Sequence, residues 1–340
     1  MQDLRRPMRG LLVLPHMFPL KETLDRASLA CLLAAVTFLT SCRSNSDVIA
    51  VIPRTTSTMF WEAEHAGAEF AARKAGVHIR WNAPTRADDV RLQIGIVERA
   101  VNRRSRGLIL TPDEPRALMV PVERALSAGI PTVIVGSTLS LPAQRNLYYI
   151  VNDEEMIGRM AAARIGEVVH GQGSVAVVGI DPQSVSSLAV LKSFVSELEE
   201  QFPNIAIVDR RVAATNDLDS ELIVSQILQL HPKIDAIFSL DSMGTVGSYL
   251  ALKGHSLTDS VKVVGVEQGA ELANAVRLGQ IDALIAEDTY QMGYRAVQLL
   301  TRPPTQPGVI KLSPILITAA NVDAQETKPF MTNDWRSELP

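Results

Sequence analysis

Short apolar runs rich in β-branched residues alternate with longer segments of helical period along most of the chain. The runs are apolar throughout instead of alternating in polarity, which is typical of parallel strands covered on both faces. We predict strands at residues 48–53, 77–81, 107–112, 131–137, 148–153, 174–180, 205–212, 235–241, 261–267 and 282–288.

The segments between these runs carry apolar residues at the spacing of a helix. Residues 60–76 have one apolar stripe that ends at Gly76, which predicts a helix with a glycine stop. Leu92 and Ile96 belong to a second stripe of this kind, and residues 223–230 contain a third. Helices are therefore expected between most of the strands.

The repeated strand–helix–strand order predicts an α/β fold with doubly wound parallel sheets. The strands form two series of about five each, which is the number expected for two such sheets. The two series are separated near Asn152 and Asp153. We therefore expect two lobes, each built on its own sheet.

The N-terminal region has a different pattern. Residues 29–39 read LACLLAAVTFL and follow the positive charges of Lys21 and Arg26. A transmembrane helix needs about 20 apolar residues, whereas the apolar core of a secretory signal has about 7–15. This segment is therefore predicted to be a signal for export.

The LTSC sequence at residues 39–42 resembles a bacterial lipobox, in which the cysteine is lipid-modified and becomes the first residue of the mature protein. The polar residues after Cys42 favour this interpretation. The alternative is a buried N-terminal helix in which Cys42 is an ordinary small residue. We expect residues 1–41 to be a leader with signal peptide and residues 42–47 to tether the lipid anchor.

Composition excludes several classes of function. The formal net charge of −4 argues against a nucleic-acid partner. The two cysteines, Cys31 and Cys42, are predicted to leave with the signal and to carry lipid, so no disulfide is expected. The sequence contains no histidine pair at metal-ligand spacing, no GxGxxG or Walker loop and no GxSxG nucleophile motif. No metal, cofactor or catalytic residue is therefore predicted.

Ligands of open parallel sheets bind beyond the carboxyl ends of the strands. Hydroxyl and aromatic side chains follow the first strand at residues 54–61, and Ser137 follows the fourth. Carboxylates follow three strands of the second series, at Asp241, Glu267 and Glu287. Carboxylates accept hydrogen bonds from polyol hydroxyls, and aromatic rings can lie against the C–H face of a sugar. The pattern therefore predicts a site for a small polar molecule.

These residues also have structural alternatives. At least one of the adjacent Phe60 and Trp61 could belong to the core. Asp241 and Glu267 could each cap the helix that follows, and Glu287 could be a surface acid. The sequence leaves these alternatives open.

The chain after Asp47 resembles the periplasmic sugar-binding proteins of the ribose-binding type, which are ligand-capture subunits of ABC importers. The resemblance is strongest in residues 48–76, 231–254 and 261–300. It implies a type 1 periplasmic binding protein fold, in which a hinge of three segments joins two lobes.

The resemblance also implies where the lobes begin and end. The N-terminal lobe would contain residues 48–151 and 288–313. The C-terminal lobe would contain residues 152–287 and 314–325. Residues 326–340 would form a polar tail, in which Phe330 and Trp335 could dock on a lobe.

Ligand contacts in the resembled family come from both lobes. The matching positions here are Thr58, Phe60, Trp61, Asp241, Glu267 and Glu287. The sequence departs from the family at the site: Gly136 and Ser137 replace an aspartate–arginine pair, and residues 184–188 contain no basic residue where the family has a second arginine. Asp241 replaces an asparagine and Glu287 a glutamine. The loss of arginines and gain of carboxylates favour a ligand with an amino group or unusual hydroxyls over plain ribose.

The predicted function is therefore that of a monomeric, lipid-anchored solute-binding protein on the extracytoplasmic face of the membrane. It would deliver a sugar or an amino-containing polyol to an ABC permease. The alternative is a ligand sensor that signals to a chemoreceptor or sensor kinase. A repressor core would need a basic helix-turn-helix before residue 48, where the apolar signal and Cys42 lie. An enzyme is not expected, because the acids have no paired nucleophile or base.

Overall fold

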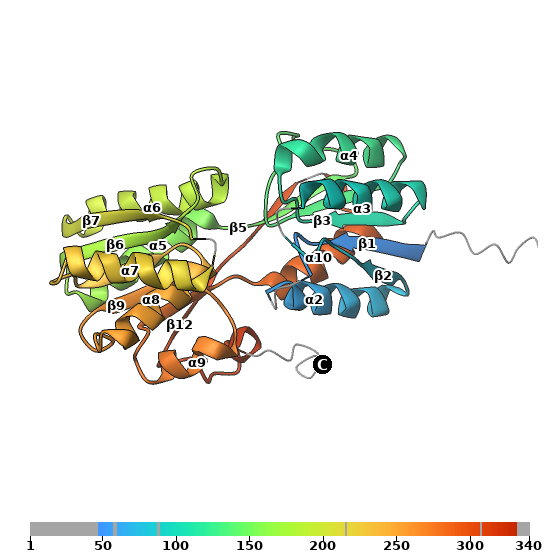
Figure 1. Ribbon diagram of the computed structural model, residues 1–340. Coiled ribbons are helices and arrows are strands. Elements are labelled where there is room, and N and C mark those ends of the chain that lie inside the picture. Colours follow the sequence, from blue (N-terminus) through green and yellow to red (C-terminus); the bar gives the residue numbers. More distant parts are fainter. Residues whose placement is uncertain (1–46, 57–59, 87–88, 215, 307, 332–340) are drawn as a thin grey trace, which may run out of the picture. The chain divides into compact units, whose positions relative to one another are not determined.

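The computed structural model describes residues 47–56, 60–86, 89–214, 216–306 and 308–331, which contain two six-stranded sheets (Figure 1). The strands of the first sheet are β1 (Val48–Ile52), β2 (His78–Trp81), β3 (Gly107–Leu110), β4 (Thr132–Val135), β5 (Leu147–Asn152) and β11 (Val309–Leu312). They are all parallel and have the order β11–β5–β4–β3–β1–β2.

The second sheet repeats this plan. Its strands are β6 (Gln172–Ile180), β7 (Asn204–Val212), β8 (Ala236–Ser239), β9 (Lys262–Val266), β10 (Ala283–Ala286) and β12 (Ile315–Thr318). Their order is β12–β10–β9–β8–β6–β7, and only the edge strand β12 is antiparallel to its neighbour. All ten predicted strands are present, whereas β11 and β12 were not predicted.

Helices cover both faces of each sheet. On the first sheet, α2 (Phe60–Ala75) and α10 (Thr289–Thr301) pack on one face, and α3 (Val90–Asn102) and α4 (Pro115–Ser127) on the other. On the second sheet, α5 (Glu154–Val168) and α6 (Val185–Gln201) pack on one face. The opposite face carries α7 (Asp217–Leu230), α8 (Ser242–Gly254) and α9 (Ala270–Arg277). The predicted doubly wound fold is confirmed.

The chain passes from one sheet to the other three times. The first crossing leads from β5 to α5, the second from β10 to α10, and the third from β11 to β12. These crossings match the predicted hinge of three segments. The lobe boundaries predicted at 151/152, 287/288 and 313/314 stay predictions.

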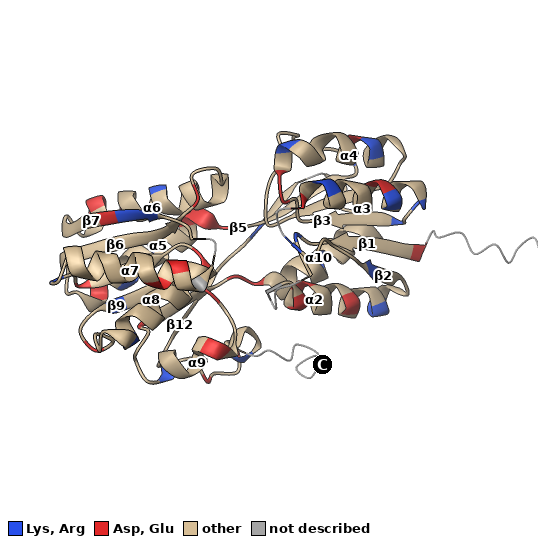
Figure 2. Ribbon diagram, viewed as in Figure 1, with Lys and Arg blue, Asp and Glu red and all other residues tan. Residues whose placement is uncertain are grey.

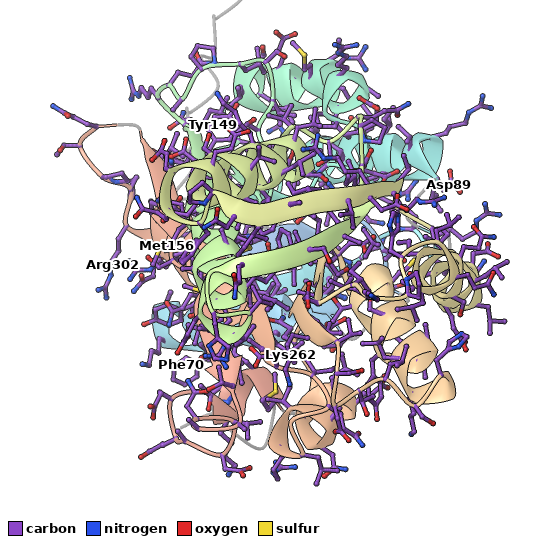
Figure 3. The ribbon with its side chains drawn as sticks, turned by 90° about the vertical axis from the view of Figure 1, so that its left-hand side faces the viewer. Phe70, Asp89, Tyr149, Met156, Lys262 and Arg302 are labelled. Carbon is purple, nitrogen blue, oxygen red and sulfur yellow. The ribbon has the colours of Figure 1, made fainter. Side chains whose placement is uncertain are left out.

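The second crossing is secured by a close contact between α10 and α2. A Cβ added to Gly67 would lie 2.0 Å from the carbonyl oxygen of Tyr290, and one added to Gly293 would lie 2.0 Å from that of Glu64. Farther along α2, Phe70 (labelled in Figure 3) packs against Tyr294 with 6.1 Å between ring centroids. Because only glycine permits this backbone approach, α10 is fixed tightly to α2 directly after the crossing.

The described C-terminal segment ends in a 3₁₀ helix at Lys328–Met331. Phe330 is only 5% exposed and belongs to the core of the second sheet on the face covered by α9. Phe330 therefore docks, which was one of the arrangements that the sequence left open, while Trp335 lies outside the described residues.

The predicted signal, lipid tether and Cys42 also lie outside the described residues. Within the described part of the chain, no helix has the length and apolar character needed to cross a membrane.

Candidate functional site

Acidic and amide side chains meet where the first two crossings leave their sheets. Asn152 is the last residue of β5, and Glu287 is the first residue after β10. The Asn152 Nδ2 atom donates a hydrogen bond of 2.6 Å to Glu287 Oε1. Asn152 is buried and Glu287 is half-buried. Because the two residues stand at the ends of β5 and β10, this hydrogen bond connects the first two crossing segments.

The environment of Glu287 opposes its negative charge. Burial is the largest cause and, with the nearby charges of Glu154 and Glu267, raises its pKa to about 7, while Arg54 acts in the opposite direction. Glu287 therefore exchanges its proton near neutral pH, and it is not the surface acid that the sequence left as an alternative.

Glu154 also belongs to this acidic group, and it was not among the predicted site residues. It is the first residue of α5, directly after the helix cap Asp153, whose Oδ1 accepts a hydrogen bond from the Met156 N–H. Burial raises the pKa of Glu154, while a hydrogen bond from Ser186 and the charge of Lys311 lower it. In the sequence it is indistinguishable from an ordinary acid in the first turn of a helix.

Glu267 is held by two donors. Its Oε1 accepts a 2.6 Å hydrogen bond from the backbone N–H of Gln268, and the hydroxyl of Ser242 donates to its Oε2. The residue at the N-cap of α9 is Gly269, so Glu267 is not the helix cap that the sequence left open. The side-chain amide of Gln268 in turn donates to the hydroxyl of Thr289, at 2.9 Å.

Asp241 does act as a helix cap. Its Oδ1 accepts a 2.8 Å hydrogen bond from the N–H of Gly244 in the first turn of α8. Gly179 leaves room for this carboxylate, because a Cβ there would lie 2.3 Å from Asp241 Oδ1. The capping alternative is therefore what the structure has, and a ligand contact of Asp241 stays a prediction.

The predicted residues of the first sheet are described only in part. Thr58 lies outside the described residues, and Phe60 begins α2 without a described side chain. Trp61 is half-buried at the second position of α2, and Ser137 is half-buried in the loop after β4. Their ligand contacts stay predictions.

Gln93 holds the loops that follow β1 and β3. It is 0% exposed, and its Nε2 donates to the carbonyl oxygens of Pro53 at 3.1 Å and Thr111 at 2.9 Å. Its Oε1 accepts from the N–H of Asp113 at 3.0 Å. The apolar spacing predicted Leu92 on the buried stripe instead, and Leu92 is 40% exposed. That prediction was wrong, because the backbone acceptors of the two loops make the amide the better core residue.

A buried acid lies beside the same edge of the first sheet. Glu64 of α2 is 1% exposed, and neither of its carboxylate oxygens has a hydrogen-bond partner of normal geometry. Burial raises its pKa to about 8, and the hydroxyl of Thr111, the residue after β3, has a smaller lowering effect. Thr111 is itself 1% exposed, and its Oγ1 has no partner of normal geometry either.

Among the residues that the structure describes, no three His, Cys, Asp or Glu side chains are grouped so that they could hold a metal ion. The polar groups at the two sheet edges therefore offer hydrogen bonds and charge, and they suit a small hydrophilic ligand.

Two doubly wound sheets, three crossings and polar strand ends define a two-lobed binding protein. Residues 49–302 match the family described as periplasmic binding protein domain, and the chain belongs to this family. The resemblance stated from the sequence is confirmed. The members of the family are binding proteins, and their location is periplasmic.

Curated relatives cover most of the chain. The D-allose-binding periplasmic protein of Escherichia coli (strain K12) is 22% identical over 268 residues, which are 77% of this chain and 86% of the relative. The ribose import binding protein RbsB of the same strain is 24% identical over 290 residues, which are 81% of this chain and 92% of the relative.

Solved structures share the fold. The solute-binding protein of an ABC transporter from Agrobacterium vitis with bound D-fucose has a TM-score of 0.75 and 25% identity, and the match covers 84% of this chain and 99% of that one. A carbohydrate-transporter solute-binding protein from Agrobacterium radiobacter in complex with D-arabinose has the same TM-score and coverage at 22% identity.

Proposed function

We propose that the chain captures a sugar or sugar derivative between its two lobes and hands it to an ABC permease, while a lipid on Cys42 anchors it to the membrane. The proposal is supported by the relatives. The two curated relatives are named for the sugars allose and ribose, and the two solved structures contain bound D-arabinose and D-fucose. It describes a monomeric binding protein that carries out no covalent chemistry.

The observation that carries the proposal is the set of carboxylates at the edge of the second sheet. Glu267 and Glu287 are half-buried at the ends of β9 and β10, and Asp241 follows β8 (acidic residues are red in Figure 2). Carboxylates only accept hydrogen bonds, and sugar hydroxyls supply donors in the number needed to satisfy them.

The first lobe would supply the complementary contacts. Thr58 and Ser137 offer hydroxyls, and Phe60 or Trp61 offers an aromatic face for the C–H side of a sugar ring. A ligand that touches both lobes makes all its contacts only when the lobes are closed, so binding favours the closed state. A permease that recognises this state would receive only loaded protein.

The test is a thermal-shift titration of the full-length chain with D-allose, D-ribose, D-arabinose, D-fucose and D-glucose. A ligand that binds only the folded state raises the melting temperature by mass action. At least one sugar should produce a shift that Trp61→Ala abolishes. The exposed Glu123 of α4 provides the control, because Glu123→Gln should respond like the wild type. No shift with any carbohydrate would refute the proposal.

Asp241 needs a more selective variant, because it also caps α8. Asparagine is an equally good N-cap, whereas alanine costs about 1 kcal/mol. Asp241→Asn should therefore melt like the wild type without ligand and, because its amide still accepts hydrogen bonds but carries no charge, weaken the sugar response without abolishing it. Asp241→Ala should lower the melting temperature without ligand and abolish the sugar response. An unchanged sugar response in both variants would remove the Asp241 side chain from the site.

The lipid anchor is tested separately in bacteria fed with a labelled fatty acid. The wild-type chain should incorporate the label and fractionate with membranes, and Cys42→Ser should do neither. Labelling of the Cys42→Ser variant would show that the anchor is elsewhere.

A further inference from the structure

We propose that the ligand carries a positively charged group, such as a protonated amine on a sugar ring, and that this group binds at Glu287 beside Glu154 and Glu267. This inference rests on the proposed function and names the chemical class of the ligand for the same site.

Only one of the two carboxylate oxygens of Glu287 accepts a hydrogen bond within the described part of the chain. Its Oε1 accepts the hydrogen bond from Asn152, and its Oε2 accepts none from the part of the chain that the structure describes. Asn152 is neutral, so this bond orients the carboxylate without neutralising it. Glu287 is half-buried, so this second oxygen is free to accept a donor from solvent or from a ligand.

The charges around Glu287 are unbalanced. Glu154 and Glu267 act on it as negative neighbours, and Arg54 is the positive one. Glu154 in turn feels Asp153 and Lys311. Four carboxylates therefore face two cations. A cationic group would relieve this repulsion, whereas a neutral sugar would leave it in place.

The residues that follow the strands of the second sheet add no compensating charge. An acid follows four of these strands: Asp181 after β6, Asp241 two residues after β8, Glu267 after β9 and Glu287 after β10. Neither lysine nor arginine occurs between any of these four strands and the helix that follows it. The positive charge needed at this edge must therefore come largely from the ligand.

The experiment compares matched ligands by calorimetry on the full-length chain. Glucosamine, galactosamine and mannosamine are each titrated against the parent hexose and against the N-acetyl derivative, which keeps the skeleton but removes the charge. In at least one series the amine should bind at least about tenfold tighter than both neutral partners, the gain expected of one charge-assisted hydrogen bond. This preference should shrink at high salt, because ions screen the attraction.

Two variants locate the effect. Glu287→Gln keeps the shape and the bond to Asn152 but removes the charge, so it should reduce the preference for the amine to within a few-fold. Glu271→Gln removes an exposed acid from α9 of the same lobe and should keep the wild-type preference. Circular dichroism of both variants verifies that they are folded.

The outcomes separate the two proposals. Neutral hexoses that bind as tightly as their amines in every series would overturn this inference and leave the proposed function standing. A preference for the amine that survives in Glu287→Gln would also overturn it. No binding of any of these compounds would overturn the inference, and the five-sugar titration would then decide the proposed function by itself.

Discussion

The side chain of Asn152 donates a 2.6 Å hydrogen bond to the carboxylate of Glu287. Asn152 ends β5 of the first sheet and Glu287 follows β10 of the second, so the bond links the first two crossings between the sheets. It joins residues 135 positions apart in the sequence. The first two crossings are therefore coupled by a hydrogen bond between side chains.

Replacement of Asn152 by Asp should turn this bond into a repulsion. Two adjacent carboxylates cannot both ionise, so the variant should lose about 1–3 kcal/mol of stability, with a larger loss above neutral pH than at about pH 5. Thermal melts across this pH range measure the effect. The double variant Asn152→Asp/Glu287→Gln exchanges donor and acceptor and should recover most of the loss. A double variant no more stable than Asn152→Asp would contradict the pairing.

Gln93→Leu should weaken the first lobe although leucine suits a buried helix position. It removes three hydrogen bonds and leaves the carbonyl oxygens of Pro53 and Thr111 without their donor, at a cost of about 2–4 kcal/mol. Urea denaturation measures the free energy of unfolding. Gln201→Leu, at the exposed end of α6, should change it by less than about 0.5 kcal/mol. Equal effects of the two variants would show that the Gln93 bonds are unimportant.

Glu64 should make the protein less stable as pH rises. Its pKa is raised from 4.5 to about 8 by burial, so between these values the folded state keeps a proton that the unfolded state has released. The unfolded state binds fewer protons, and the free energy of unfolding therefore falls with pH in this window. Below the lower value the contribution vanishes, because both states are protonated.

Glu64→Gln removes this titration. The stability of the variant relative to the wild type should rise by an amount on the order of 3 kcal/mol between about pH 5 and pH 8. Urea denaturation at each pH gives the comparison, and the exposed Glu123→Gln variant should follow the wild type throughout. A difference between Glu64→Gln and wild type that is constant with pH would mean that Glu64 does not titrate as described.

Gly293→Ala should be strongly destabilising. The new Cβ would lie 2.0 Å from the carbonyl oxygen of Glu64, so α10 would have to move away from α2, at a cost of about 3 kcal/mol or more. Gly254, at the end of α8, has no atom within 4 Å of the equivalent Cβ position. Gly254→Ala should therefore be neutral or slightly stabilising. Differential scanning calorimetry distinguishes these outcomes, and equal melting temperatures would rule out the close contact.

The fold was predictable from the sequence because most strands are buried on both faces. Such strands read as continuous apolar runs, as in the GLIL of β3 and the ALIA of β10. β11 and β12 were missed because each has four residues, lies at the edge of a sheet and is partly exposed. Edge strands of this kind lack the pattern on which the prediction depends.

The site was predictable only in outline. The rule that ligands bind at strand ends pointed to Asp241, Glu267 and Glu287 without their contacts. Glu154 and Gln93 are brought to these edges by the packing of α5 and α3, which no local pattern reports. The choice between a cap and a ligand contact at Asp241 depends on the distance to Gly244, which only the structure supplies.

The docking of Phe330 has a practical consequence. Asp47 lies directly before β1 of the first sheet. Lys328 lies two residues before Phe330, and Phe330 is packed in the core of the second sheet. A dye attached at Asp47 would move with the first sheet, and a dye attached at Lys328 would move with the second. Energy transfer between them would then report movement of one half against the other, and the chain could serve as a fluorescent sensor for whatever it captures.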